Sequence, residues 1–266
     1  MADLTMAWAQ DPTVALPGEV RSFLQRLGFL KPDPPLPQLP APGEFSPLGL
    51  TFLMTNQCQL RCTYCYAAAG DSPRRHLSLE TGYAAIDYAY QSLTSQGRDK
   101  FHISLHGGGE PTFPWRTMRQ LVAYARQKPI PVEISLTSNG IWSRQQTLWI
   151  LAYIDSVGLS MDGSPQTQDA QRPMASGRAS SPWVMQTIRE LEANRRRYRV
   201  RMTAMPPYDR LAEDVRYLCE NTLCRRMQVE PAFTPHRGGG YQYQMEEAMQ
   251  FLGAFLEAQR LAEHYG

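Results

Sequence analysis

From residue 48 onward, short apolar segments alternate with segments whose apolar residues recur every three or four positions. The short segments predict strands at Leu48–Thr55, Phe101–Leu105, Val132–Thr137, Val157–Met161, Tyr198–Met205 and Met227–Phe233. The periodic segments predict helices at Leu79–Leu93, Trp115–Gln127, Gln145–Ile154, Trp183–Asn194, Leu211–Leu218 and Met245–Leu256. Six strand-then-helix units predict an α/β fold with a parallel sheet and helices outside it.

Residues 1–47 follow another pattern and are expected to form a separate N-terminal region ahead of a core domain at 48–266. Val20–Leu30 has helical spacing and is expected to end near Gly28. Lys31–Pro47 is crowded with prolines, which favours a stiff, extended linker. We interpret the short helix as docking on the core domain, with recognition of a partner as the alternative.

Composition narrows the class of protein. The chain has 266 residues, 42% hydrophobic and 20% charged, which suits one folded α/β domain. A net charge of +2 argues against a dedicated nucleic-acid binder. No signal-peptide pattern opens the chain, and no apolar run reaches membrane-spanning length. We therefore expect a cytoplasmic protein without a membrane partner.

Three of the five cysteines fall within eight residues, at Cys58, Cys62 and Cys65. Three thiolates with this C-x3-C-x2-C spacing can hold three irons of a cubane cluster and leave one iron without a protein ligand. Such an open position is where a substrate or cofactor binds. Cys219 and Cys224 lie elsewhere and are interpreted as structural, apolar cysteines.

The other polar and glycine-rich motifs each follow an expected strand. The cysteine loop follows the first strand, His106–Pro111 the second, Ser138–Gly140 the third and Ser160–Gly163 the fourth. In barrels of parallel strands the active site lies at the carboxyl ends of the strands. These motifs are therefore expected to converge on one site.

Together these motifs, from Leu48 to Phe233, resemble those of radical S-adenosylmethionine enzymes. The resemblance implies a partial (βα)6 TIM-like barrel and a [4Fe–4S] cluster on Cys58, Cys62 and Cys65. It also implies S-adenosylmethionine on the open iron and an external electron donor of the ferredoxin or flavodoxin type. No residue that acts directly on the substrate is assigned.

The resemblance also implies contacts to the cofactor. Gly108, Gly109 and Glu110 would face its amino group, because glycine permits close backbone approach and the carboxylate accepts a hydrogen bond. Tyr64, between two cysteines, would lie along the adenine. An ordinary turn and loop packing are the structural alternatives for these two motifs.

Four further positions match cofactor contacts of the family. Ser160 and Arg172 would face the cofactor carboxylate, which suits a bidentate guanidinium; a surface arginine is the alternative. Asn139 belongs to an SNG element that resembles the family's TNG. Phe233 would line the adenine pocket or pack in the core, and Glu230 could face the ribose or the substrate.

The run around the fourth strand resembles the SPASM/twitch branch, which includes anaerobic sulfatase maturases and peptide maturases. That resemblance implies a peptide or protein substrate. The branch usually carries auxiliary clusters, but no C-terminal cysteine cluster is present here, so the chain is either a fragment or a minimal member. Radical chemistry on a small molecule or nucleotide and a structural Fe–S or zinc module are the alternatives.

A basic run, Arg195–Arg199, ends an expected helix, where cations interact favourably with the helix dipole. We interpret it as a solvated helix end. Contact with an acidic leader peptide is the alternative, and we expect no nucleic-acid partner.

Overall fold

The computed structural model describes residues 18–26, 45–232, 237–239 and 245–265. It contains one parallel sheet of six strands in the order β1-β2-β3-β4-β5-β6. The strands are β1 (Gly49–Leu53), β2 (Phe101–His106), β3 (Val132–Ser138), β4 (Ser156–Ser160), β5 (Arg199–Ala204) and β6 (Met227–Pro231). Each strand pairs with the next along the chain, which confirms the predicted α/β partial barrel.

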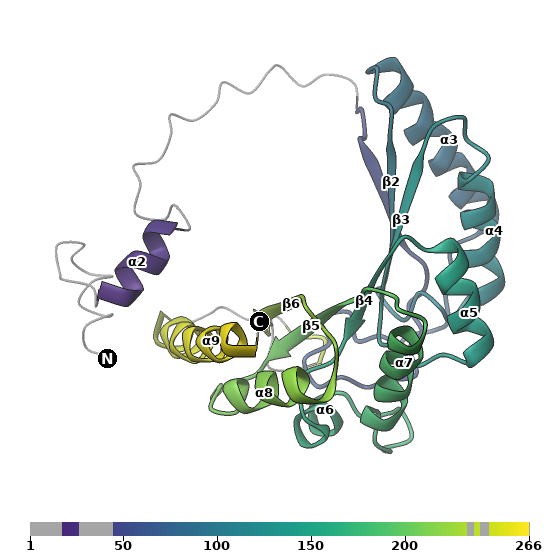
Figure 1. Cartoon of the computed structure of the whole chain (residues 1–266). Helices are drawn as coiled ribbons and strands as arrows, with labels where there is room; N and C mark the ends of the chain where they lie inside the picture. The colour runs from purple at the N-terminus through teal and green to yellow at the C-terminus, as the bar shows by residue number, and fades with distance from the viewer. Residues whose placement is uncertain (1–17, 27–44, 233–236, 240–244, 266) are drawn as a thin grey trace.

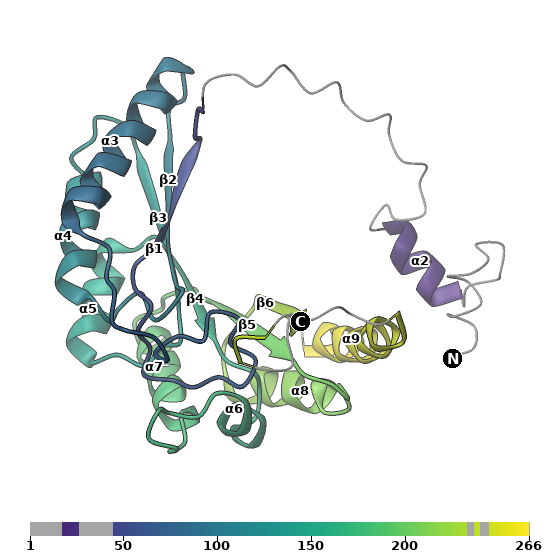
Figure 2. The ribbon, with the colours of Figure 1, turned by 180° about the vertical axis from the view of Figure 1, so that it is seen from behind.

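Helices follow the strands and lie on the outer side of the curved sheet (Figure 1). They are α3 (Leu79–Ser95), α4 (Trp115–Ala125), α5 (Arg144–Tyr153), α6 (Pro165–Gln171), α7 (Ser181–Ala193), α8 (Leu211–Asn221) and α9 (Met245–Tyr265). Figure 2 shows the loops after β1 crossing the end of the sheet where the other strands also finish. Strands β1 and β6 are the two end strands, so the barrel formed by the described residues is open between them.

Buried and accessible side chains alternate along the strands, so one face of the sheet packs in the core and the other, concave face is accessible to solvent. In β2, Phe101, Ile103 and Leu105 are buried, while the side chains between them are exposed or half-buried. The buried set joins Ile86 of α3 and Leu121 of α4 in one hydrophobic core. The alternate set is polar and faces the concave side, as expected for a sheet covered on one face only.

Two details of the sequence-based expectation were wrong. Strand β1 ends at Leu53, two residues before the expected Thr55, which instead makes an isolated bridge with His76. A helix, α6, lies between β4 and α7, where the sequence pattern predicted none. It starts at Ser164, whose hydroxyl accepts from the backbone N–H of Thr167, and Pro165 takes the first turn, where a missing N–H costs nothing.

The N-terminal helix α2 covers Gly18–Arg26. The Phe23 ring lies 6.1 Å from that of Phe255 on α9, and Glu19 lies 3.4 Å from Arg260 of the same helix. These contacts agree with docking of α2 on the core. The expected cap at Gly28, most of the proline-rich linker and Phe233 lie outside the described residues. Among the described helices, none is long and apolar enough to cross a membrane.

Candidate active site

The cysteine loop after β1 is fixed by backbone pairing with the segment that follows α6. Arg61 N–H donates to Pro173 O at 2.8 Å, and Thr63 N–H donates to Gln171 O at 2.9 Å. The Arg61 guanidinium donates to the carbonyls of Cys58 and Gly70, 2.8 and 3.2 Å away. The loop therefore holds its shape through backbone contacts, independently of the cysteine side chains.

The glycine loop after β2 packs directly on the cysteine loop. Glu110 N–H donates to Gln57 O at 2.8 Å. A Cβ atom at Gly109 would lie 2.2 Å from the same carbonyl oxygen, whereas one at Gly108 would meet nothing closer than 3.6 Å. Gly109 is thus required for contact between two protein loops, and Gly108 is the glycine with free space beside it.

This difference gives a prediction with a matched control. Gly109→Ala must displace the Gln57 backbone, so we expect a loss of about 1–3 kcal/mol in unfolding free energy, typical of overpacking. It should also lower iron retention after reconstitution. Gly108→Ala should change both much less. The measurements are urea denaturation and iron content; equal effects of the two substitutions would contradict the packing argument.

Glu110 is buried and accepts four hydrogen bonds from the protein. Its Oε1 accepts from the hydroxyls of Ser138 and Thr112, both at 2.7 Å, and from Thr112 N–H at 3.1 Å. Among the described residues, its Oε2 accepts from Asn139 N–H alone, at 2.9 Å. Burial raises the pKa of this carboxyl, and the four donors oppose that rise. The side chain ties the ends of β2 and β3 together, and Oε2 retains room for one further donor.

Asn139 connects the end of β3 to the first cysteine. Its Nδ2 lies 3.6 Å from Cys58 Sγ, and its Oδ1 accepts from Ile141 N–H and from the Gln59 amide. Leu60 N–H also points at Cys58 Sγ, at 3.4 Å. Donors directed at cysteine sulfur are a regular feature of iron–sulfur sites, where they tune the cluster.

Arg172, Asp162 and Tyr64 form a buried group beside the second cysteine. Asp162 Oδ2 lies 2.9 Å from Arg172 Nε, as an ion pair, and accepts a hydrogen bond of 2.5 Å from the Tyr64 hydroxyl. The Arg172 guanidinium lies 5.3 Å above the Tyr64 ring, and its Nη1 lies 3.9 Å from Cys62 Sγ. With Nε facing Asp162, Nη1 is directed toward Cys62.

Asp162 lies in the Ser160–Gly163 motif but had no predicted site role, and it contacts both other members of this group. Its second oxygen, Oδ1, accepts from Thr203 N–H of β5 at 2.9 Å. Burial raises the pKa of the Tyr64 phenol well above its usual range, so the phenol stays protonated and donates to Asp162. The carboxylate thus fixes both neighbouring side chains.

One cavity of about 230 Å3 brings the candidate residues together. It is lined by Cys58, Cys62, Cys65, Tyr64, Gly108, Gly109, Glu110, Asn139, Ser160 and Arg172, among others. In the described part of the chain, no three Cys, His, Asp or Glu side chains gather as ligands of a single metal ion. The cysteines instead surround a shared space, which fits a cluster whose irons each take one thiolate.

The surroundings of Cys58 and Cys62 raise the pKa values of both thiols. Burial, reinforced by the Glu110 carboxylate, raises the pKa of Cys58 to about 12. Burial likewise raises the pKa of Cys62, against the opposing charge of Arg172. The shift favours the protonated thiols, so iron binding at these positions would have to displace their protons.

A polar group that the motifs did not reveal lies across the concave face. Arg201 of β5 donates to Glu230 of β6 at 3.0 Å, and its Nη1 lies 3.2 Å from His106 Nε2 of β2. All three line the same cavity as the cysteines. The sequence signal for these three residues was their place at polar positions of strands in which apolar residues alternate with them. Among them, Glu230 had been considered for the site and His106 belongs to the motif expected after the second strand, whereas Arg201 had not been considered.

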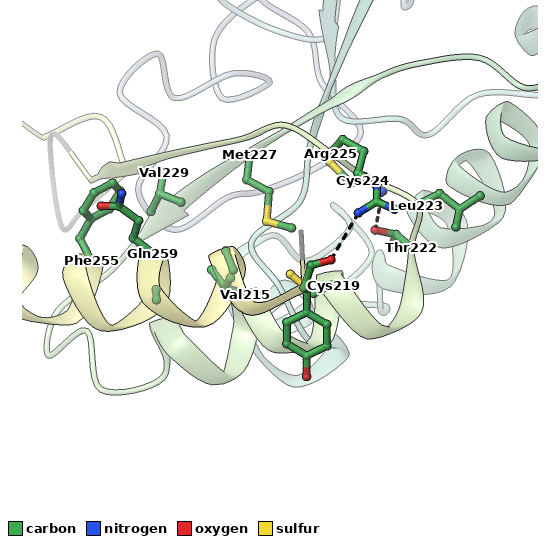
Figure 3. A pocket seen from close by; sticks show the side chains of 13 residues that line it. Val215, Cys219, Thr222, Leu223, Cys224, Arg225, Met227, Val229, Phe255 and Gln259 are labelled. Carbon is green, nitrogen blue, oxygen red and sulfur yellow. Dashed lines mark hydrogen bonds between the residues drawn. The ribbon is translucent and has the colours of Figure 1, made fainter.

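Cys219 and Cys224 lie in a different pocket, of about 330 Å3, between α8, α9 and β6 (Figure 3). Burial raises the pKa of both thiols, and Cys224 Sγ contacts Arg226 O at 3.2 Å. Val215, Val229 and Phe255 line the same pocket. The surroundings are those of structural cysteines.

Comparison with known proteins agrees with this geometry. The family described as the Radical SAM superfamily matches residues 52–218. The chain is 37% identical to the Fe-coproporphyrin III synthase of Methanosarcina barkeri over 46% of this chain and 29% of that protein. It is 30% identical to the sporulation killing factor maturation protein SkfB of Bacillus subtilis, over 61% of this chain and 37% of that protein.

The solved structures include one described as native anSMEcpe with bound AdoMet, with a TM-score of 0.65 and 18% identity. The match covers 79% of this chain and 60% of that one, and at this identity it bears on the fold alone. The chain spans about a third of the length of the two curated relatives. Since the family match covers more than half of the chain and the cavity carries its motifs, the chain belongs to the radical S-adenosylmethionine superfamily, whose members use a [4Fe–4S] cluster and S-adenosylmethionine.

Proposed function

We propose that this barrel generates a radical that acts on a peptide or protein side chain, as part of a maturase. The observation that carries the proposal is the single cavity that holds the three cysteines, the Gly-Gly-Glu loop, Ser160 and Arg172 and continues to the polar concave face. When bound, the cluster and S-adenosylmethionine supply a one-electron cleavage that gives methionine and a 5′-deoxyadenosyl radical, which removes a hydrogen atom from the substrate.

The residues of the chain would bind and orient these groups. Cys58, Cys62 and Cys65 would hold the cluster. Arg172, with Nε held by Asp162, would offer its Nη groups to the cofactor carboxylate beside Cys62, with Ser160 nearby. Because Asp162 balances its charge, Arg172 is not a lone buried cation before the cofactor binds, and its remaining N–H groups can still donate to a carboxylate.

Glu110 and Gly108 would face the cofactor amino group. The free acceptor position on Glu110 Oε2 and the space beside Gly108 support this assignment. Tyr64 would present its ring toward the adenine, Asn139 would support the Cys58 sulfur, and Phe233 would complete the adenine pocket. The electron would come from an external donor of the ferredoxin or flavodoxin type.

Similarity to SkfB, a maturation protein, over 61% of the chain supports the peptide substrate. A second candidate is radical chemistry on a small molecule, favoured by the higher identity to Fe-coproporphyrin III synthase over 46% of the chain. Both candidates use the same cofactor cavity and differ in what enters from the concave face.

The test is anaerobic reconstitution to about four irons per chain, followed by measurement of 5′-deoxyadenosine with a low-potential reductant. A short peptide encoded next to this gene, synthesised with deuterated side chains, should transfer deuterium into 5′-deoxyadenosine and change in mass. Stimulation by a porphyrin or nucleotide, without deuterium transfer from the peptide, would favour the second candidate. Absence of 5′-deoxyadenosine in folded, iron-loaded protein would refute both.

A further inference from the structure

A second cleft lies at the opposite end of the strands from the cysteines. It has a volume of about 850 Å3 and opens where β4, β5 and β6 begin. Six arginines line it, against two carboxylates, Asp155 and Glu192. The arginines are Arg195, Arg196, Arg197, Arg199, Arg225 and Arg226. They come from the α7–β5 connection, the start of β5 and the segment before β6, so the fold gathers them.

Both carboxylates of this arginine cleft are already engaged. Asp155 pairs with Arg126, outside the cleft, at 2.6 Å and accepts from Ile134 N–H at 2.7 Å. Glu192 Oε1 accepts from the Tyr198 hydroxyl and from Leu223 N–H. Within the described part of the chain, neither carboxylate forms an ion pair with an arginine of the cleft, so the positive charge of those arginines is not neutralised by direct pairing with Asp155 or Glu192.

Four of the arginines, Arg195, Arg197, Arg199 and Arg226, take part in no ion pair within the described residues. Arg199 Nε is also buried without a hydrogen-bond partner among those residues. The Arg199 side chain packs against Gly158 of β4, and a Cβ atom at position 158 would lie 2.9 Å from Arg199 Nε. Arginines that line one cleft repel one another, and an anionic ligand would offset that repulsion.

Arg195 occupies a backbone position that favours glycine. The C-terminus of α7 forms a Schellman motif, with Arg195 N–H donating to Glu192 O and Arg196 N–H to Leu191 O. Arg195 takes the left-handed position of this motif, with φ of 54°. An arginine where glycine is less strained indicates a role for its charged side chain.

We propose that the arginine cleft binds an acidic segment of the peptide substrate, outside the residue that is modified. This rests on the proposed function above. Guanidinium groups bind carboxylates in a bidentate manner. Leu223, 69% exposed beside them, offers an apolar contact to a peptide. The aromatic side chain in the lining, Tyr198, is buried and bonded to Glu192, so it offers no stacking surface of the kind that single-stranded nucleic acids use.

The distance along the barrel sets a length requirement. Strand β5 has six residues from Arg199 to Ala204, and at about 3.3 Å each it spans roughly 20 Å between the two ends. An extended substrate would therefore need at least about six residues between its acidic segment and the modified side chain.

The test uses a fluorescein-labelled decapeptide of alternating glutamate and glycine, with glutamine replacing glutamate in the control peptide. Anisotropy with the iron-loaded protein should show preference for the glutamate peptide, weakening with salt. Arg195→Glu/Arg197→Glu/Arg226→Glu should weaken binding at least about tenfold through charge reversal. Arg144→Glu, which reverses an exposed arginine of α5 outside the cleft, should not.

Arg195→Gly guards against a folding defect, because glycine suits the left-handed position. This variant should keep the stability of the protein and still weaken binding of the glutamate peptide.

Equal binding of the two peptides, unchanged binding by the triple variant, or tighter binding of a ten-base-pair DNA duplex would overturn the proposal. Peptide-independent 5′-deoxyadenosine formation should persist in all variants. If the wild type cleaves S-adenosylmethionine but ignores the glutamate peptide, the cleft proposal fails alone; if it binds without cleaving, the proposed function fails.

Discussion

Cys62→Ala should abolish iron retention and 5′-deoxyadenosine formation while leaving the barrel folded. Loss of even an outer partner of a metal ligand typically costs about 10–100-fold in affinity, so loss of a ligand should cost more. The loop should survive, since Arg61 and Thr63 pair with Pro173 and Gln171 through backbone atoms. Iron content, cluster absorbance and thermal unfolding measure the three outcomes.

Cys219→Ala is the matched control for this experiment. Cys219 is a half-buried thiol on α8 in a separate pocket, so its replacement should retain iron and turnover. The stability change should be about 1 kcal/mol or less. If Cys62→Ala retained a full cluster, or if it unfolded the protein as a structural zinc site would, the assignment of the cysteines would be wrong.

Asp162→Asn should destabilise the fold by about 3–5 kcal/mol, because it leaves the buried Arg172 without its counter-charge. Asp162 has no exposed side-chain surface, and the Arg172 side chain is 10% exposed. In asparagine an NH2 group replaces one of the two carboxylate oxygens. The hydrogen bond from the Tyr64 hydroxyl is then lost, or the amide must turn to keep it. Urea denaturation of the iron-free protein measures the loss.

Two comparisons separate this effect from a general loss of charge. Glu213→Gln breaks an exposed pair with Arg210, and such a pair is worth about 1 kcal/mol or less. Arg172→Gln combined with Asp162→Asn should recover part of the loss, since the lone buried charge is then absent. A loss below about 1 kcal/mol for Asp162→Asn alone would show that water reaches Arg172 and that the ion pair is not structural.

The sequence predicted more of the secondary structure than of the site's internal contacts. Period-two alternation and helical spacing are local, so six strands and the helices between them were found from residues such as Phe101 and Leu121. Helix α6 was missed because Pro165–Gln171 carries few apolar residues, and its cap at Ser164 shares a motif that also fits a turn. The end of β1 was misplaced because Met54 and Thr55 continue an apolar pattern after the strand pairing has ended.

For the site, too, local sequence patterns predicted some features and missed others. Cysteine spacing predicted Cys58, Cys62 and Cys65 as cluster ligands, and the family resemblance added Glu110 and Arg172 as predicted cofactor contacts, since these signals are short and local. They did not reveal that Glu110 already accepts hydrogen bonds from the Ser138 hydroxyl and the Asn139 N–H. Contacts between side chains separated by 28 residues or more depend on how strands are paired, which no local pattern encodes.

By itself, the sequence determined the strand–helix alternation, the cluster loop and the family-specific cofactor motifs. Tertiary structure alone decided that Asp162 joins Tyr64 and Arg172, that Gly109 serves loop packing, and that arginines from separate segments share one cleft. The physical reason is that hydrophobic periodicity and ligand spacing act over a few residues. Charge compensation and steric fit act through space between chain segments that the parallel sheet brings together.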